Sequence, residues 1–157
     1  MTDRDAILLL EQYRAGLEAE IALLRQLDTI AVRQRDVTET RDFEQLAAES
    51  DVRDRLTLTL VTIEKGVREV REALNASKIA LNRFEVYQQV VALRHTAAEF
   101  VQRILKIDRE SMKSLGDAEL ARRAALASLE RGETTLAAYR RVIAPPVSSA
   151  ALVDRRG

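Results

Sequence analysis

The stretch Leu56-Thr-Leu-Thr-Leu60-Val-Thr-Ile63-Glu-Lys-Gly-Val67-Arg-Glu-Val70-Arg-Glu-Ala-Leu74 decides the fold class of this chain. Its apolar residues at positions 56, 60, 63, 67, 70 and 74 alternate steps of four and three. This is the heptad spacing of a helix that packs along one seam. The alternation of Leu and Thr before Ile63 would by itself indicate a β-strand. Because the charged flanks contain no turn signal, we predict helix throughout.

The same spacing recurs later in the chain. A second seam consists of Val86, Val90, Leu93, Ala97, Phe100, Ile104 and Ile107. A further apolar stripe runs beside it, formed by Tyr87, Val91, Ala98, Val101 and Leu105. An apolar face this wide is expected to meet more than one neighbour. We predict that the two seams face each other across a helical hairpin.

Helix boundaries follow from the punctuation of the pattern. Asp42 and Gln45 resemble a capping box, and Gly116 followed by Asp117 is typical of a helix end and a new cap. Residues 75–82 weaken the helical pattern. We therefore predict four helices, over residues 3–35, 42–76, 79–115 and 117–143.

These elements define an all-α fold, an elongated antiparallel bundle of three to four long helices with coiled-coil-like packing. The bundle is expected over residues 1–144, which is the size of one domain. Pro145 and Pro146 end the last helix, and residues 145–157 are predicted to be a disordered tail.

Composition excludes several classes of function. Twenty-five basic residues balance twenty-five acidic ones, so strong attraction to nucleic acid or to an anionic membrane is not expected. The chain has no cysteine, which excludes disulfides and thiolate chemistry. It shows neither a secretory signal nor an apolar segment long enough to cross a bilayer. We expect a cytoplasmic protein.

Candidates for chemistry are few. His95 is the only imidazole, and we interpret it as a surface residue of the third predicted helix. Four carboxylates, Asp108, Glu110, Asp117 and Glu119, are interleaved with basic residues. That interleaving is typical of a solvated face more than of an acid–base pair or a cation site. We predict no catalytic residue, no metal and no cofactor, and hence no enzyme.

A protein-binding surface is the better interpretation. Gly66 and Gly132 each cost roughly 1 kcal/mol relative to alanine inside a helix, and such a cost is consistent either with close approach of a partner or with packing inside the bundle. Aromatic anchors on apolar stripes often dominate binding. The predicted partner-binding residues are Val101, Leu105, Leu129, Gly132, Leu136 and Tyr139.

Several segments resemble the flagellar export chaperones of the FlgN/FliT type. The first are the Leu/Glu-rich opening helix over residues 8–30, the stretch Asp42-Phe-Glu-Gln-Leu46, and the charged segment over residues 53–60. The more specific ones are Ile104-Leu-Lys-Ile-Asp-Arg-Glu-Ser-Met-Lys-Ser-Leu115 and residues 126–140, which include Ala138-Tyr139. The family closes its C-terminal helix on a similar Ala-Tyr pair. The chain departs from the family in lacking its asparagine-rich stretch and the glycine after the tyrosine.

The resemblance implies a cytoplasmic chaperone that holds a late flagellar subunit and prevents its premature assembly. The filament-cap protein or a hook–filament junction protein is the implied client, with components of the export apparatus as further partners. The amphipathic helix of the client would lie in a groove between the third and fourth helices. The alternative is a structural coiled-coil or adaptor protein that forms a homodimer or links other proteins through its seams.

Overall fold

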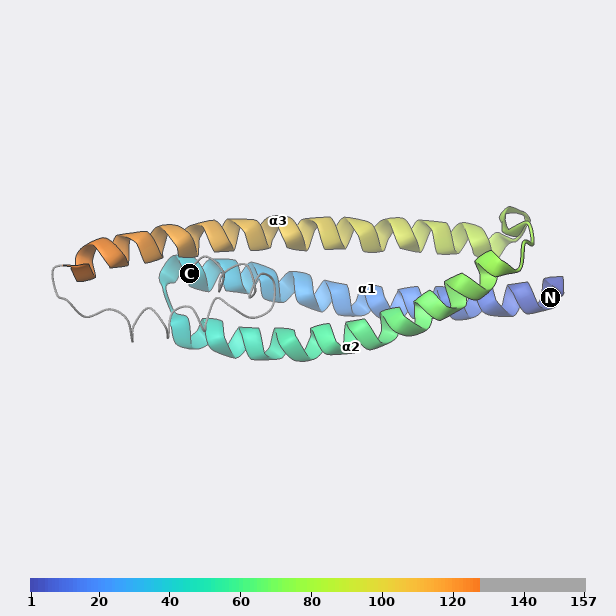
Figure 1. The fold of residues 1–157 in the computed structure, drawn as a ribbon, viewed down its shortest axis with the longest axis horizontal. Coiled ribbons are helices and arrows are strands. Elements are labelled where there is room, and N and C mark those ends of the chain that lie inside the picture. The colour runs from blue at the N-terminus through green and yellow to red at the C-terminus, as the bar shows by residue number, and fades with distance from the viewer. Residues whose placement is uncertain (128–157) are drawn as a thin grey trace. The chain divides into compact units, whose positions relative to one another are not determined.

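The computed structural model describes residues 1–127, which are almost entirely helical. Helix α1 spans Asp3–Thr40, α2 spans Phe43–Ala76 and α3 spans Glu85–Ala127, with a short 3-10 helix, η1, over Leu81–Arg83 (Figure 1). No strand occurs in this part of the chain. The all-α helical fold is confirmed, and the Leu-Thr alternation before Ile63 is helical as predicted.

Three predicted boundaries differ from the structure. The first helix continues past Arg35 to Thr40, and the third begins at Glu85 instead of Ile79. The predicted helix end at Gly116 is wrong, because α3 runs through it to Ala127. Leu115 is buried beside Val37 and Leu46, and this packing holds the helix across the glycine. The rest of the predicted fourth helix and the predicted tail lie outside the described residues.

The link between α1 and α2 is a tight two-residue turn. Arg41 has a positive φ of 57°, and the backbone N–H groups of Arg41 and Asp42 donate to the carbonyls of Thr38 and Val37. This is the Schellman pattern that ends many helices. The Asp42 carboxylate then accepts a hydrogen bond from the N–H of Gln45 at 3.1 Å, so the predicted cap of the second helix is confirmed.

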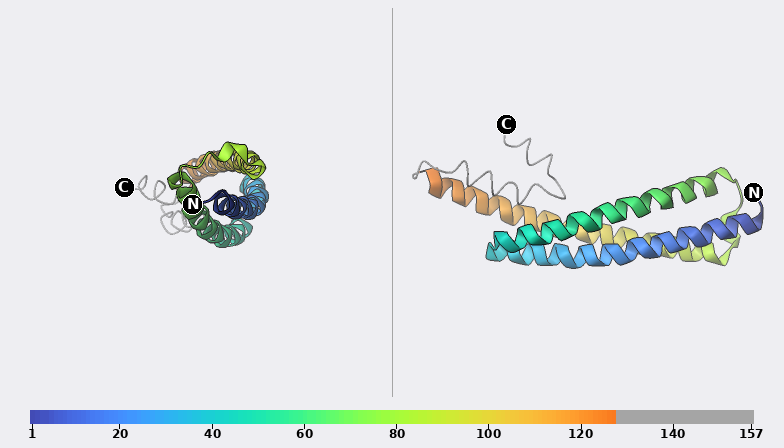
Figure 2. Two further views of the ribbon diagram at one scale, coloured as in Figure 1. Left: turned by 90° about the vertical axis from the view of Figure 1, so that its right-hand side faces the viewer. Right: turned by 90° about the horizontal axis from the view of Figure 1, so that it is seen from below.

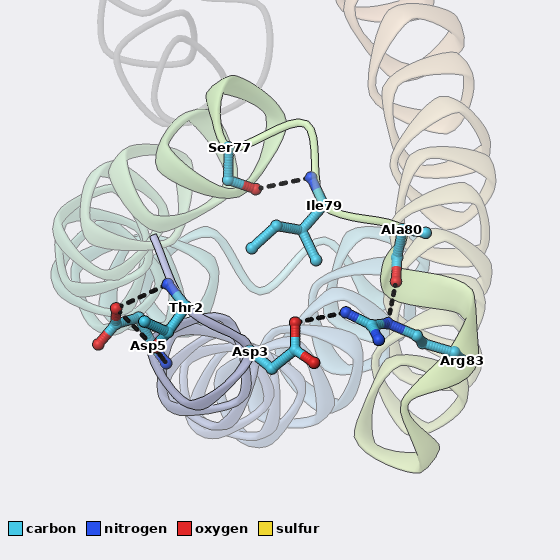
Figure 3. A network of polar contacts seen from close by, with 7 residues as sticks. All are labelled: Thr2, Asp3, Asp5, Ser77, Ile79, Ala80 and Arg83. Atoms are coloured by element: carbon cyan, nitrogen blue, oxygen red, sulfur yellow. Dashed lines mark hydrogen bonds and ion pairs between the residues drawn. The ribbon is translucent and has the colours of Figure 1, made fainter.

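The start of α1 and the link between α2 and α3 are fixed by the polar contacts shown in Figure 3. Thr2 and Asp5 bond each other's backbone N–H groups, which is a reciprocal cap for α1. The backbone N–H and the hydroxyl of Thr2 both donate to the Asp5 carboxylate, and these two hydrogen bonds lower the pKa of Asp5. Arg83 forms an ion pair with Asp3 and donates to the carbonyl of Ala80. The α2–α3 link is thereby tied to the first turn of α1.

The helices pack in two compact units. The first unit combines Met1–Asp28 with Leu56–Arg103. In this unit α2 runs antiparallel to α1, whereas α3 runs parallel to it (Figure 2). Its buried core contains residues of all three helices: Leu10, Tyr13, Leu17, Val67, Leu74 and Val90. Further apolar residues, each partly buried, pack around this core. The predicted hairpin is therefore confirmed for Val67, Leu74 and Val90, but the hairpin closes on α1 as its third member.

The second unit combines Thr29–Arg55 with the chain from Ile104 onward. Its apolar cluster contains Val37, Leu46 and Leu115, with Phe43 packed against it. Polar side chains take up much of the remaining interior. Gln34, Ser50, Arg53, Asp108 and Ser111 are all buried.

Helix α1 supplies a continuous buried stripe, which we call the inner stripe of α1. All its members are buried and alternate steps of four and three: Ala6, Leu10, Tyr13, Leu17, Glu20, Leu24, Leu27, Ala31, Gln34 and Thr38. Three of these ten heptad positions are polar. Within each unit, the neighbouring helices therefore pack on this face of α1.

Gly16 marks a close approach of α1 and α2. A Cβ atom at this position would lie 2.5 Å from Cγ2 of Val67, whereas a Cβ atom at Gly66 or Gly116 would meet nothing within 4 Å. Packing inside the bundle therefore does not explain Gly66 among the described residues, and close approach of a partner at Gly66 stays a prediction. Gly16, which the sequence pattern did not single out, is the glycine that allows two helices to meet.

Candidate protein-binding surface

The apolar stripe predicted beside the α3 seam is largely uncovered. Val101 is 41% exposed, Leu105 38% and Val91 41%, while Ala98 is exposed and Tyr87 is half-buried. We call these five residues the α3 stripe. Successive members stand three, four or seven residues apart, so they share one face of the helix.

The neighbouring seam of α3 is also incompletely covered. Val90 and Ile104 are buried, but the three seam residues between them, Leu93, Ala97 and Phe100, are only half-buried. Phe100 is met on one side by the Arg25 guanidinium, 5.8 Å from the ring centre. The middle of α3 therefore retains apolar surface that the described residues do not bury.

The predicted binding residues divide into two groups. Val101 and Leu105 lie on the α3 stripe, where a partner can reach them. Leu129, Gly132, Leu136 and Tyr139 lie outside the described residues, so their placement stays a prediction.

A second exposed apolar site lies on α2. Leu58 is 68% exposed and Val61 is 61% exposed, and the two stand three residues apart on one face. Lys65 and Arg68 continue this face toward the end of the helix, and Asp51 and Asp54 continue it toward the start. The heptad spacing at Leu56, Leu60 and Ile63 predicted the inner seam of this stretch but not this outer face.

The interior of the second unit is organised by an ion pair that the sequence analysis did not identify. The guanidinium of Arg53 donates to both carboxylate oxygens of Asp108, at 2.7 and 2.6 Å, and both residues are 6% exposed. Arg53 also donates to Gln34, whose amide donates to Ser50. The interpretation of Asp108 as part of a solvated face is wrong, because this bidentate partner is buried with it.

The other predicted carboxylates do not form a site. Glu110 pairs with Arg35 at 3.0 Å on the surface, and no metal-binding cluster of His, Asp or Glu occurs among the described residues. His95 is exposed, as predicted, and lies 2.9 Å from Glu99. Glu110 and His95 thus each contact one side chain that can carry the opposite charge.

Glu20 is the most perturbed titratable group of the first unit. Burial, and a hydrogen bond to the carboxylate of Glu64, raise the pKa of Glu20 to about 8. Arg71, 3.6 Å from Glu64, acts in the opposite direction. Near neutral pH the protonated Glu20 donates to Glu64 and joins α1 to α2.

Comparison of the chain with protein-family models, with curated proteins and with solved structures finds no match. Within residues 1–127, no helix combines the length and the apolar character needed to cross a membrane.

Proposed function

We propose that this protein is a helical binding module that holds an amphipathic helix of a partner on the α3 stripe, and that it serves as a cytoplasmic export chaperone of the flagellar kind. The observation that carries the proposal is the exposure of Val91, Val101 and Leu105 on one face of α3. Apolar residues on one helical face offer the anchor spacing that an amphipathic helix recognises.

The length of the stripe suits such a partner. Residues 87–105 extend for about 27 Å at 1.5 Å per residue, which is about five turns of a partner helix. Arg94 occupies the heptad position between Val91 and Ala98, so a bound helix is expected to place an acidic or polar side chain opposite it. Lys106, next to Leu105, contributes to a polar rim. A helix bound here would have its apolar face covered, so that it could not assemble prematurely with other subunits.

The resemblance to the FlgN/FliT-type chaperones supplies the client class. The proposed client is the filament-cap protein or a hook–filament junction protein, bound through its C-terminal amphipathic helix. Residues 129–139 are proposed to add contacts from the segment that follows α3.

A binding assay with purified subunits tests this function. We expect the C-terminal helix of one of these flagellar subunits, labelled with a fluorophore, to bind the full chain. Val101→Ser with Leu105→Ser should weaken binding by at least about tenfold, since both changes remove exposed apolar area at the C-terminal end of the α3 stripe. Leu58→Ser on α2 is the matched control and should bind as the unmodified chain does.

The outcome that counts against the proposal is equally specific. If none of these subunits binds, the flagellar client class is wrong. If a subunit binds but the Val101/Leu105 variant holds it as tightly as the Leu58 control does, the α3 stripe is not the binding surface.

A further inference from the structure

The outer face of α2 has a self-complementary pattern. We call it the α2 outer stripe, and its eight positions alternate steps of four and three: Ala47, Asp51, Asp54, Leu58, Val61, Lys65, Arg68 and Glu72. All eight are exposed or half-buried. This is a second heptad stripe on the same helix, separate from the residues that α2 buries against α1.

Charge is distributed along the α2 outer stripe in two blocks. Two acidic residues, Asp51 and Asp54, precede the apolar pair, and two basic residues, Lys65 and Arg68, follow it. A third acidic residue, Glu72, ends the stripe outside these two blocks. None of the four side chains in the two blocks forms an ion pair with another described residue. The helix thus offers an acidic block, an apolar centre and a basic block on a face that is exposed or half-buried.

Reversing the direction of the helix maps this pattern onto itself. A twofold axis midway between Leu58 and Val61 would place Leu58 of one copy against Val61 of the other. The same axis sets Asp54 against Lys65 and Asp51 against Arg68. Antiparallel heptad packing requires this kind of pairing, and a twofold interface is self-complementary by construction.

We propose that α2 pairs antiparallel with the α2 of a second copy through the α2 outer stripe, forming a weak homodimer. The occupant of this face is a second copy because the two charge blocks of the stripe complement each other when the second copy runs in the opposite direction. A parallel arrangement would set like charges against each other at all five charged positions. The apolar centre has two residues per copy, so the interface is expected to be of the small, transient size. The proposal does not depend on the α3 stripe or its client.

Charge reversal at one pair of positions tests the dimer and its direction together. Sedimentation equilibrium of the full chain, at concentrations up to about 500 µM, should show reversible dimerisation. Asp54→Lys and Lys65→Asp should each raise the dimer Kd by at least about tenfold, because each sets like charges against each other across the interface. The double variant Asp54→Lys/Lys65→Asp should restore the original Kd.

Mixing supplies a rescue that a change in folding cannot imitate. An equimolar mixture of the Asp54→Lys chain and the Lys65→Asp chain should form a heterodimer that neither forms alone. Arg94→Asp, an exposed charge reversal on α3, is the control that should leave the Kd unchanged, and circular dichroism of dilute samples checks that every variant is helical. A chain that stays monomeric throughout the concentration range overturns the proposal. A dimer Kd that neither single charge reversal changes also overturns it, as does a mixture of the two single variants that forms no heterodimer.

Discussion

At Gly16, α1 and α2 approach so closely that a methyl group has no room. A Cβ atom there would lie 2.5 Å from Cγ2 of Val67, and Val67 is buried and β-branched, so its side chain has little freedom to move away. Alanine would gain up to about 1 kcal/mol of helix propensity. Overpacking a core costs about 1–3 kcal/mol.

We expect Gly16→Ala to lower the free energy of unfolding by about 1 kcal/mol, because overpacking outweighs the gain in propensity. Urea denaturation followed by circular dichroism measures this change. Gly66→Ala is the matched control, since its Cβ would meet nothing within 4 Å, and it should raise the free energy of unfolding by up to about 1 kcal/mol. Stabilisation by both variants would show that α1 and α2 can separate slightly at no cost.

At the scale of the helices, hydrophobic spacing predicted that the elements exist but not which faces they bury. The charged flanks of Leu56–Ile63 correctly predicted a helix there and not a strand. Leu10, Leu17, Leu24 and Ala31 of the inner stripe of α1 were predicted as seam from their spacing, but its polar members Glu20, Gln34 and Thr38 were missed. Polar residues are not identified as core when hydrophobicity alone is considered. The spacing Leu10, Tyr13, Leu17 and then Leu24, Leu27, Ala31 points to an inward residue at position 20. That signal was present in the sequence.

The buried partners of such polar residues were beyond prediction from one sequence. Nothing local to Arg53 indicates that its carboxylate lies on a helix 55 residues further on. The same holds for the candidate binding surface: the α3 stripe was visible as a pattern, but its exposure depends on which of its two apolar faces α1 covers. Heptad spacing shows which residues share one face of a helix, whereas the burial of that face depends on how all three helices pack together.

The ion pair between α2 and α3 gives a prediction at this scale. Asp108→Ala leaves the Arg53 guanidinium buried without its carboxylate, so the free energy of unfolding should fall by about 3–5 kcal/mol. Glu110→Ala removes an exposed pair on the same helix and should cost only about 0–1 kcal/mol. Thermal and urea denaturation of the two variants measure the contrast.

Replacing both charges distinguishes the net contribution of the ion pair to the free energy of unfolding from the loss of stability caused by leaving one charge buried alone. The double variant Arg53→Leu/Asp108→Leu should regain most of the stability lost in Asp108→Ala, because no buried charge is left unpaired. A double variant as unstable as Asp108→Ala would show that the hydrogen bonds to Gln34, and not the charges, hold this region together.

For the whole molecule, the pKa of Glu20 makes stability depend on pH. The pKa is raised from 4.5 to about 8 in the folded chain, so the folded state binds more protons than the unfolded state between these values. Stability is therefore greatest below about pH 4.5 for this group, falls as pH rises, and levels off above about pH 8. The slope for a single group is at most about 1.4 kcal/mol per pH unit.

Glu20→Gln should flatten that dependence. The amide keeps a donor toward Glu64 without ionising, so we expect the variant to be more stable than the unmodified chain at pH 9 and similar to it at pH 5. Urea denaturation at pH 5, 7 and 9 measures the difference, with Glu18→Gln, an exposed neighbour on α1, as control. A variant whose stability falls between pH 5 and 9 as steeply as that of the control would mean that Glu20 is ionised in the folded chain.

The constant register between helices has a consequence for length. Arg14 bonds Gln89 and Arg103 pairs with Asp28, so both contacts join residues of α1 and α3 that are 75 apart, and the Arg35–Glu110 contact has the same separation. A helix with such a register behaves as a repeat that can be shortened by whole heptads. Removing residues 14–20, 64–70 and 89–95 together would bring each remaining inner position back to its own partner, whereas removing two residues from α1 alone would rotate every later buried side chain by about 200° and so away from the core. The length of the helices can thus be adjusted in steps of about 10 Å.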